Sequence, residues 1–233
     1  MAIPTQKSLD RFPRGLRLPL YRRVFARINR LVDPVIGPFR LRFAARRRPL
    51  RIVVGSSGIA PRGWVPTDRW YLDLTKPEMW RRFMKAGSVD AILAEHVWEH
   101  LSPEQAVLAV RTCREFLANS GYMRIAVPDA WNPSTDYQQW IQPGGRGPGA
   151  HDHKVIYNVK TMTALLRQEG FDVEALEWFD EGGQFHEQPW DPAKGKIERS
   201  RRFDHRNADG QLRYTSLIVE ARPRRSESTS ERS

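Results

Sequence analysis

The chain has 233 residues, of which 40% are hydrophobic and 28% are charged, a composition typical of globular proteins and not of disordered ones. It contains one cysteine, Cys113, which excludes an internal disulfide and a multi-cysteine metal site. The net charge of +11 resides in residues 1–50, where 13 basic residues outnumber two acidic ones, because the remaining 25 basic and 25 acidic residues cancel. The charge therefore belongs to the N-terminal segment, and the rest of the chain need not bind nucleic acid to account for it.

No stretch of the sequence approaches the roughly 18 apolar residues that a membrane-spanning helix needs. Charges recur every few residues near the N-terminus, unlike the uninterrupted apolar core of a signal peptide. We therefore predict a cytoplasmic protein.

Residues 1–49 are predicted to form a basic arm that contains one amphipathic helix, which ends around Pro34 and Gly37. Such a helix either docks on the domain as a cap or lies on an anionic membrane surface through residues 18–48. Docking is the favoured interpretation and nucleic acid is the least favoured partner. The apolar stripe of this helix consists of Tyr21, Val24, Phe25, Ile28, Leu31 and Val32.

From residue 50 onward, strand and helix patterns alternate, which predicts an α/β fold. We expect a Rossmann-like sandwich in which a mostly parallel central sheet carries helices on both faces. One expected helix follows an N-cap at Ser102 and runs over 103–119, and another covers 158–170. The expected strands are 50–55, 65–68, 70–74, 88–94, 122–127, 173–179 and 214–221.

Two long segments interrupt this alternation. Residues 130–157 are rich in Gly, Pro, His and Trp, and residues 180–212 are polar. An irregular segment as long as the first is unusual inside a domain and is typical of a functional loop or lid. The domain is therefore predicted to span 50–222, with a disordered tail over 223–233.

The first expected strand ends in a turn of four small residues, Gly55, Ser56, Ser57 and Gly58. Ligands of open parallel sheets bind beyond the carboxyl ends of the strands, and small residues let a ligand approach the backbone amides. Asp68 ends the second expected strand, where its carboxylate can accept hydrogen bonds from both hydroxyls of a ribose. Asp73 ends the third expected strand, where it could receive an adenine amino group. Each feature alone is typical of an ordinary turn, but the combination indicates a cofactor site.

Four segments together resemble the ordered motifs of class I S-adenosylmethionine-dependent methyltransferases: 55–68 (GSSGIAPRGWVPTD), 71–75 (YLDLT), 90–101 (DAILAEHVWEHL) and 123–129 (MRIAVPD). The resemblance is closest to a bacterial branch of predicted methyltransferases and extends to 151–158 and 204–220. The chain departs from the family at Ser57, where a second glycine is usual. It also departs in the connection between the first and second expected strands, which is too short for the helix usually found there.

The resemblance implies that S-adenosyl-L-methionine is the cofactor. It places the methionine end of the cofactor over the turn 55–58, the ribose at Asp68 and the adenine beside Asp73. Glu95 and His96 would line the place where the methyl group is transferred. The branch also implies an acceptor that is a small molecule or a glycan precursor.

Residues 96–100 (HVWEH) fit the pattern H-x-x-E-H, which also marks one class of zinc peptidases. On a helix, His96 and His100 would share a face and could converge on one metal ion. The favoured interpretation is that these residues line the substrate or support the turn, so no metal is assigned. A second is metal-assisted methyl transfer, because some small-RNA methyltransferases bind a divalent ion through Glu and His at this place. A third is a metal-dependent hydrolase that uses His96, Glu99 and His100.

Three residues are candidates for catalysis: His96, His153 and Asp129. A histidine can take a proton from an acceptor hydroxyl because its pKa lies near neutrality. The sequence thus predicts a cytoplasmic methyltransferase. The main alternative is a catalytically weak binding protein of the same fold that its basic arm recruits to a partner.

Overall fold

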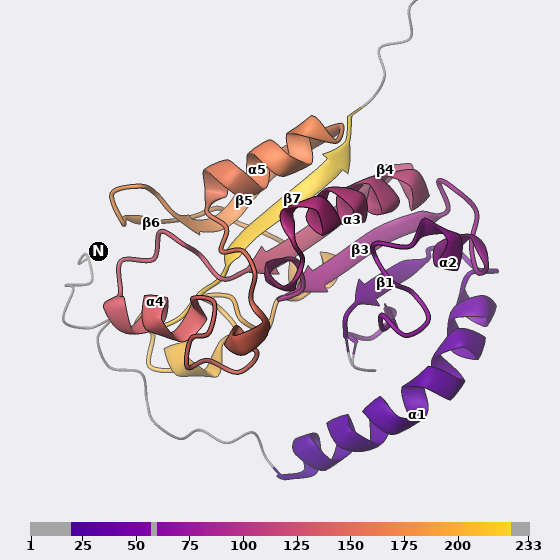
Figure 1. The fold of residues 1–233 in the computed structure, drawn as a ribbon, viewed down its shortest axis with the longest axis horizontal. Helices are drawn as coiled ribbons and strands as arrows, with labels where there is room; N and C mark the ends of the chain where they lie inside the picture. Colours follow the sequence, from indigo (N-terminus) through magenta and orange to yellow (C-terminus); the bar gives the residue numbers. More distant parts are fainter. Residues whose placement is uncertain (1–19, 57–59, 225–233) are drawn as a thin grey trace, which may run out of the picture.

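A computed structural model, which describes residues 20–56 and 60–224 and their side chains from residue 32 onward, contains a seven-stranded sheet (Figure 1). The strand order is β2-β1-β3-β4-β7-β5-β6. The strands are β1 (Arg51–Val54), β2 (Val65–Pro66), β3 (Val89–Glu95), β4 (Leu117–Val127), β5 (Phe171–Phe179), β6 (Phe185–Glu187) and β7 (Leu217–Pro223).

Most strands of the sheet run in one direction. β1 pairs in parallel with β2 and β3, and β3 pairs in parallel with β4. β7 is antiparallel to both β4 and β5, so β5 runs in the same direction as β4, whereas β6 is antiparallel to β5. This topology confirms the predicted Rossmann-like α/β fold. The chain leaves β1 for β2 and then returns to the other side of β1 for β3, so the strand order reverses between β1 and β3.

The α-helices among the described residues cover one face of the sheet. α1, α2, α3 and α5 all contribute buried residues to the core on that face, and α3 and α5 lie across the strands in Figure 1. On the opposite face, Trp64 and Ile197 pack against the strands, so segment 180–212 takes the place of a helical layer. The prediction of helices on both faces is therefore met on one face only. The helices are α1 (Leu20–Ala44), α2 (Pro77–Arg81), α3 (Pro103–Phe116), α4 (Thr135–Ile141) and α5 (Val159–Gln168).

The predicted N-cap of α3 is confirmed. The Ser102 hydroxyl accepts the Gln105 N–H at 3.3 Å, and the Gln105 side chain accepts the Ser102 N–H at 3.0 Å. Asn158 and Thr161 form the same reciprocal pair at the start of α5. α3 ends at Phe116, three residues earlier than expected, because β4 already begins at Leu117.

Residues 70–74, which we expected to form a strand, form turns instead. The N–H groups of Tyr71 and Leu72 donate to the Asp68 carbonyl at 3.2 and 2.9 Å, so the chain folds back and does not extend along the sheet. Tyr71, Leu72 and Leu74 are nevertheless buried. The apolar run thus indicated buried residues, and a short apolar run alone does not distinguish a strand from other buried structure.

The two long segments between strands are more regular than predicted. Residues 130–157 contain α4, whose N-cap Ser134 accepts the Tyr137 N–H at 3.2 Å, and a 3-10 helix over Ala150–Asp152. Residues 180–212 contain β6 and two short 3-10 helices. The helical period of α4 is too short to be recognised among the glycines and prolines that follow it.

α1 continues past Pro34 and Pro38, so the predicted end of the helix was wrong. Its second half packs on the domain, which compensates for the backbone hydrogen bonds that proline removes. Leu41 is fully buried, and a Cβ on Gly37 would lie 2.5 Å from the Tyr71 ring. The Tyr71 hydroxyl donates to Asp33 at 3.0 Å. Where its side chains are described, this helix therefore docks on the domain, although not through the apolar stripe that we predicted.

The docked face of α1 differs from the predicted apolar stripe, which includes Val32. Where side chains are described, residues that extend this stripe at helical spacing point away from the domain, whereas Asp33, Gly37 and Leu41 face it. The exposed fractions are 39% for Val32, 66% for Val35, 52% for Ile36, 74% for Phe39 and 55% for Phe43. Such a row of exposed apolar side chains is typical of a contact surface.

No helix in the described part of the chain is long and apolar enough to cross a membrane. The membrane-surface role of residues 18–48 remains a prediction. A membrane-surface role requires that the protein cosediment with vesicles that contain anionic lipid, and that the double variant V35S/F39S cosediment several-fold less because it removes apolar area from the stripe. Leu108→Ser, at an exposed leucine of α3, is the matched control. Equal cosedimentation of the double variant and the wild type would contradict the prediction.

Candidate functional site

The turn after β1 lies where the strand order reverses, which is where open α/β sheets bind ligands. Gly55 opens this turn with a φ of +64°, a conformation that side chains rarely adopt. A Cβ on Gly55 would lie 2.9 Å from Cγ2 of Val97, in the segment that follows β3. The backbone therefore passes close to the end of β3, and only glycine fits at this point of the turn.

Ser56 connects this turn to the segment that follows β2. Its N–H and its hydroxyl both donate to the Thr67 carbonyl, at 3.0 and 3.3 Å. The Thr67 N–H and hydroxyl in turn donate to the Val53 carbonyl, at 2.8 and 3.0 Å. These bonds bring the neighbouring residue, Asp68, beside the turn after β1, as the sequence predicted.

Asp68 is half-buried at this edge of the sheet. Burial raises the pKa of its carboxyl group, while N–H groups of Trp70 and Arg69 act in the opposite direction. A partly desolvated carboxylate of this kind makes stronger hydrogen bonds to a ligand than one in bulk water. The predicted cofactor contacts Ser57 and Gly58 lie outside the described residues.

Two other predicted cofactor contacts have partners within the chain. Oδ1 of Asp73 accepts the N–H and the hydroxyl of Thr75, both at 2.8 Å, in the turn before α2. The two carboxylate oxygens of Glu95 accept the N–H groups of Glu198 and Arg199, at 3.0 and 2.9 Å. Asp73 thus stabilises a turn, and Glu95 holds segment 180–212 across the end of β3.

His96 directly follows β3 and has a φ of +57°, the only positive φ of a non-glycine residue in the described ranges. This left-handed conformation costs about 1–2 kcal/mol, and such strain is concentrated at functional sites. The His96 N–H donates to the Ala126 carbonyl at 2.8 Å, and its Nε2 lies 3.0 Å from the Ser216 hydroxyl. Burial lowers the pKa of His96 well below its usual value, so its imidazole is neutral.

The segment 96–100 does not form the α-helix that an H-x-x-E-H zinc peptidase site requires. Only Trp98–His100 are helical, and they form a single 3-10 turn after the left-handed His96. His96 and His100 therefore do not share a helical face. The cluster that can hold a metal ion consists instead of Glu99, His100 and His153. The hydrolase interpretation built on His96, Glu99 and His100 loses its structural basis.

Glu99 lies at the centre of this cluster and is fully buried. Its Oε1 lies 2.9 Å from Nδ1 of His96 and 4.0 Å from Nε2 of His153. The 2.9 Å contact with His96 does not have the geometry of a hydrogen bond. Neither Glu99 oxygen has a hydrogen-bond partner among the described residues. Burial raises the pKa of Glu99 to about 7.

His153 comes to this cluster from the loop after α4. The N–H groups of Lys154 and Val155 donate to the Glu99 carbonyl at 2.7 and 3.3 Å, which fixes the loop beside the end of β3. The rings of His100 and His153 meet edge to face with centroids 4.9 Å apart. The sequence did not link these two histidines, because only backbone pairing between distant segments brings them together.

Asp129 is also fully buried, which raises the pKa of its carboxyl group to about 6. Its two oxygens accept the N–H groups of Trp131 and Phe179, at 2.9 and 2.8 Å. The carboxylate therefore joins the end of β4 to the end of β5. This placement favours a structural role, and the catalytic role of Asp129 remains a prediction.

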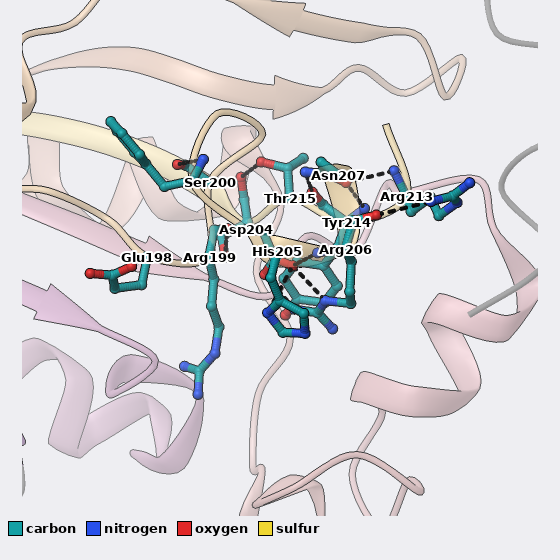
Figure 2. A network of polar contacts seen from close by, with 12 residues as sticks. Glu198, Arg199, Ser200, Asp204, His205, Arg206, Asn207, Arg213, Tyr214 and Thr215 are labelled. Atoms are coloured by element: carbon teal, nitrogen blue, oxygen red, sulfur yellow. Dashed lines mark hydrogen bonds and ion pairs between the residues drawn. The ribbon is translucent and has the colours of Figure 1, made fainter. Parts of the chain in front are cut away.

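Segment 198–216 reaches the site from the other side and is held by its own polar network (Figure 2). The Asn207 side-chain amide donates to the carbonyls of Arg201 and Tyr214 and accepts the N–H groups of Arg213 and Tyr214. The Arg199 side chain points out of this network and is exposed. Its positive charge acts on both His96 and Glu99. The sequence did not indicate Arg199, which is one of many arginines in a polar segment.

No family model matches this chain, and no curated protein matches its sequence. Solved structures with a similar fold include a SAM-dependent methyltransferase from Archaeoglobus fulgidus, with 14% identity, a TM-score of 0.40 and coverage of 86% of this chain and 98% of the other. Another is a SAM-dependent methyltransferase from Thermotoga maritima described as a possible histamine N-methyltransferase, with 11% identity, a TM-score of 0.43 and coverage of 87% and 99%.

A third is the 1,6-didemethyltoxoflavin-N1-methyltransferase of Burkholderia thailandensis, with 14% identity, a TM-score of 0.41 and coverage of 92% and 94%. TM-scores of this size mark a distant similarity of fold alone. The fold and the residues at its strand ends define a Rossmann-like α/β protein with a candidate ligand site between β1 and β3.

Proposed function

We propose that this chain is an S-adenosyl-L-methionine-dependent methyltransferase that acts on a small-molecule or glycan-precursor acceptor. One observation carries the proposal: the left-handed Gly55 turn and the half-buried Asp68 carboxylate meet at the carboxyl ends of β1 and β2, beside the reversal of strand order. The resemblance of four sequence segments to class I methyltransferases supports the same function.

The residues present suit this cofactor. Gly55 lets the backbone of the turn pass close to Val97 at the end of β3, and the sulfonium of the cofactor is positively charged, so it needs no cationic partner there. The Asp68 carboxylate is an acceptor for the two hydroxyls of the ribose. When bound, S-adenosyl-L-methionine supplies the methyl group, and the chain has mainly to hold the acceptor in line with it.

His96 follows β3 directly and lies next to Val97, which packs against the Gly55 turn, so this residue is close to the proposed cofactor site. A neutral imidazole can accept the proton that a hydroxyl acceptor releases. In this proposal, His96 is the candidate general base. The exposed guanidinium of Arg199, which acts on His96, is suited to orient an acceptor that carries a negative group.

Calorimetric titration of the purified chain with S-adenosylhomocysteine tests the proposal. We expect stoichiometric binding with a dissociation constant in the micromolar range. ATP, which shares the adenosine but carries phosphates in place of the amino acid, is the control and is expected to bind far more weakly. Absence of S-adenosylhomocysteine binding would contradict the proposal. Binding without turnover of any acceptor would favour the catalytically weak binding protein.

A further inference from the structure

The buried carboxylate of Glu99 lacks the partners that such a group requires. It is fully buried, and neither of its oxygens accepts a hydrogen bond from any residue in 20–56 or 60–224. Taking an unpaired carboxylate out of water costs several kcal/mol, so proteins keep one only where it is protonated or where it binds a cation.

The orientation of His153 leaves Glu99 without a hydrogen-bond donor from this ring as well. Its Nδ1 lies 2.6 Å from the Ile141 carbonyl oxygen, which can only accept a hydrogen bond, so Nδ1 carries the ring proton. The neutral ring therefore presents the lone pair of Nε2, and that atom lies 4.0 Å from Oε1 of Glu99. Neither this nitrogen nor Nδ1 of His96, which lies 2.9 Å from the same oxygen, makes a hydrogen bond to the carboxylate.

His100 adds a third donor atom to the same place. Its Nδ1 is buried and has no hydrogen-bond partner among the described residues, and it lies 3.4 Å from a carboxylate oxygen of Asp152. One ligand atom from each of Glu99, His100 and His153 can be chosen so that all three lie within 4.8 Å of one another. Three possible ligand atoms thus lie close together.

We propose that Glu99, His100 and His153 bind a divalent metal ion, and that Zn²⁺ is the ion that fits them best. Two imidazoles and one carboxylate are a donor set that zinc prefers, and three protein ligands leave one tetrahedral position open. Ligand atoms on one tetrahedral zinc are about 3.4 Å apart, so the cluster closes by an ångström or so when the ion binds.

The surroundings of the cluster are those of a metal site. The Ile141 carbonyl fixes the tautomer and the direction of His153, as outer hydrogen bonds do for metal-binding histidines. The backbone bonds from Lys154 and Val155 to Glu99 hold the two ligand-bearing segments together. Because Glu99 and His100 closely follow β3, the open position lies near the proposed methyl-transfer site and is suited to an acceptor oxygen. That last role rests on the proposed function, whereas metal binding does not.

The test is titration of the full chain with Zn²⁺ alone, after removal of any affinity tag and of bound metal with a chelator. A chromophoric chelator as competitor gives the affinity, and elemental analysis gives the stoichiometry. We expect one zinc per chain and a higher melting temperature with zinc. Glu99→Gln and His153→Gln are each expected to weaken binding by about 100-fold or more. His151→Gln, at an exposed histidine of the same loop, is expected to stay within about twofold of the wild type.

A second measurement separates the loss of a ligand from a failure to fold. Without metal, Glu99→Gln is expected to melt at or above the temperature of the metal-free wild type, because the variant removes a buried, unpaired charge. Its binding of S-adenosylhomocysteine is expected to stay within a few-fold of the wild type, so this proposal can fail without the proposed function failing. Absence of stoichiometric zinc in the wild type, or equal affinity in Glu99→Gln and the wild type, would overturn the proposal.

Discussion

Replacing Asp68 with alanine is expected to weaken S-adenosylhomocysteine binding by more than about 100-fold. Asp68 lies beside the Gly55 turn, and its carboxylate accepts both ribose hydroxyls in the proposed complex. A hydrogen bond to a charged group contributes about 1.5–3 kcal/mol, so the loss of two costs at least about 3 kcal/mol. Each 1.4 kcal/mol corresponds to about tenfold in affinity. Calorimetric titration of the variant against the wild type gives the ratio directly.

Two further variants control for general effects at this position. Asp172→Ala removes a carboxylate on β5 whose side chain is 70% exposed, and we expect it to bind as the wild type does. Asp68→Asn keeps the shape of the side chain but removes its charge, so its affinity should fall between those of Asp68→Ala and the wild type. An Asp68→Ala variant that binds within threefold of the wild type would contradict the role of Asp68.

Replacing Arg124 with methionine is expected to lower the free energy of unfolding by about 3–5 kcal/mol, the usual cost of breaking a buried ion pair. The Arg124 side chain on β4 is only 1% exposed, and its Nη2 donates to Glu220 at 2.7 Å. Its Nη1 donates to the carbonyls of Asp191 and Gly195 at 3.0 and 2.6 Å. Arg124 therefore also attaches segment 180–212 to the sheet.

Urea denaturation measures this loss as a lower midpoint. Arg111→Met is the matched control, because Arg111 pairs with Glu169 at the surface and such pairs contribute less than about 1 kcal/mol. The double variant R124M/E220L is expected to recover part of the loss, because it removes a buried carboxylate whose remaining ionic partner is the partly exposed Arg222. An Arg124→Met midpoint equal to that of Arg111→Met would contradict this account of the buried pair.

The sequence predicted the fold well where a local pattern is typical of a single kind of structure. The run at 50–55 became a buried strand and a glycine turn, and Ser102 became the N-cap of α3, because β-branched runs and capping residues act locally. The sequence also placed Gly55 and Asp68 together at one edge, since the carboxyl ends of neighbouring parallel strands meet there.

The sequence failed where long-range packing decides the local structure. α1 passes two prolines because its Gly37 and Leu41 dock on the domain, and segment 180–212 replaces a helical layer because Ile197 fills the core. Neither contact has a local pattern. The same reason applies to the cluster around Glu99, in which His153 arrives from a loop through backbone bonds that side-chain spacing does not encode.

The central claim is that the carboxyl ends of β1 and β2, beside the end of β3, bind S-adenosylmethionine. Hydrogen–deuterium exchange with and without S-adenosylhomocysteine tests it most directly, because bound ligand slows the exchange of the amides that it covers. The account predicts slower exchange in peptides that contain residues 55–69 and 95–97, and no change in α5. Unchanged exchange in those peptides, or protection confined to other parts of the chain, would contradict it.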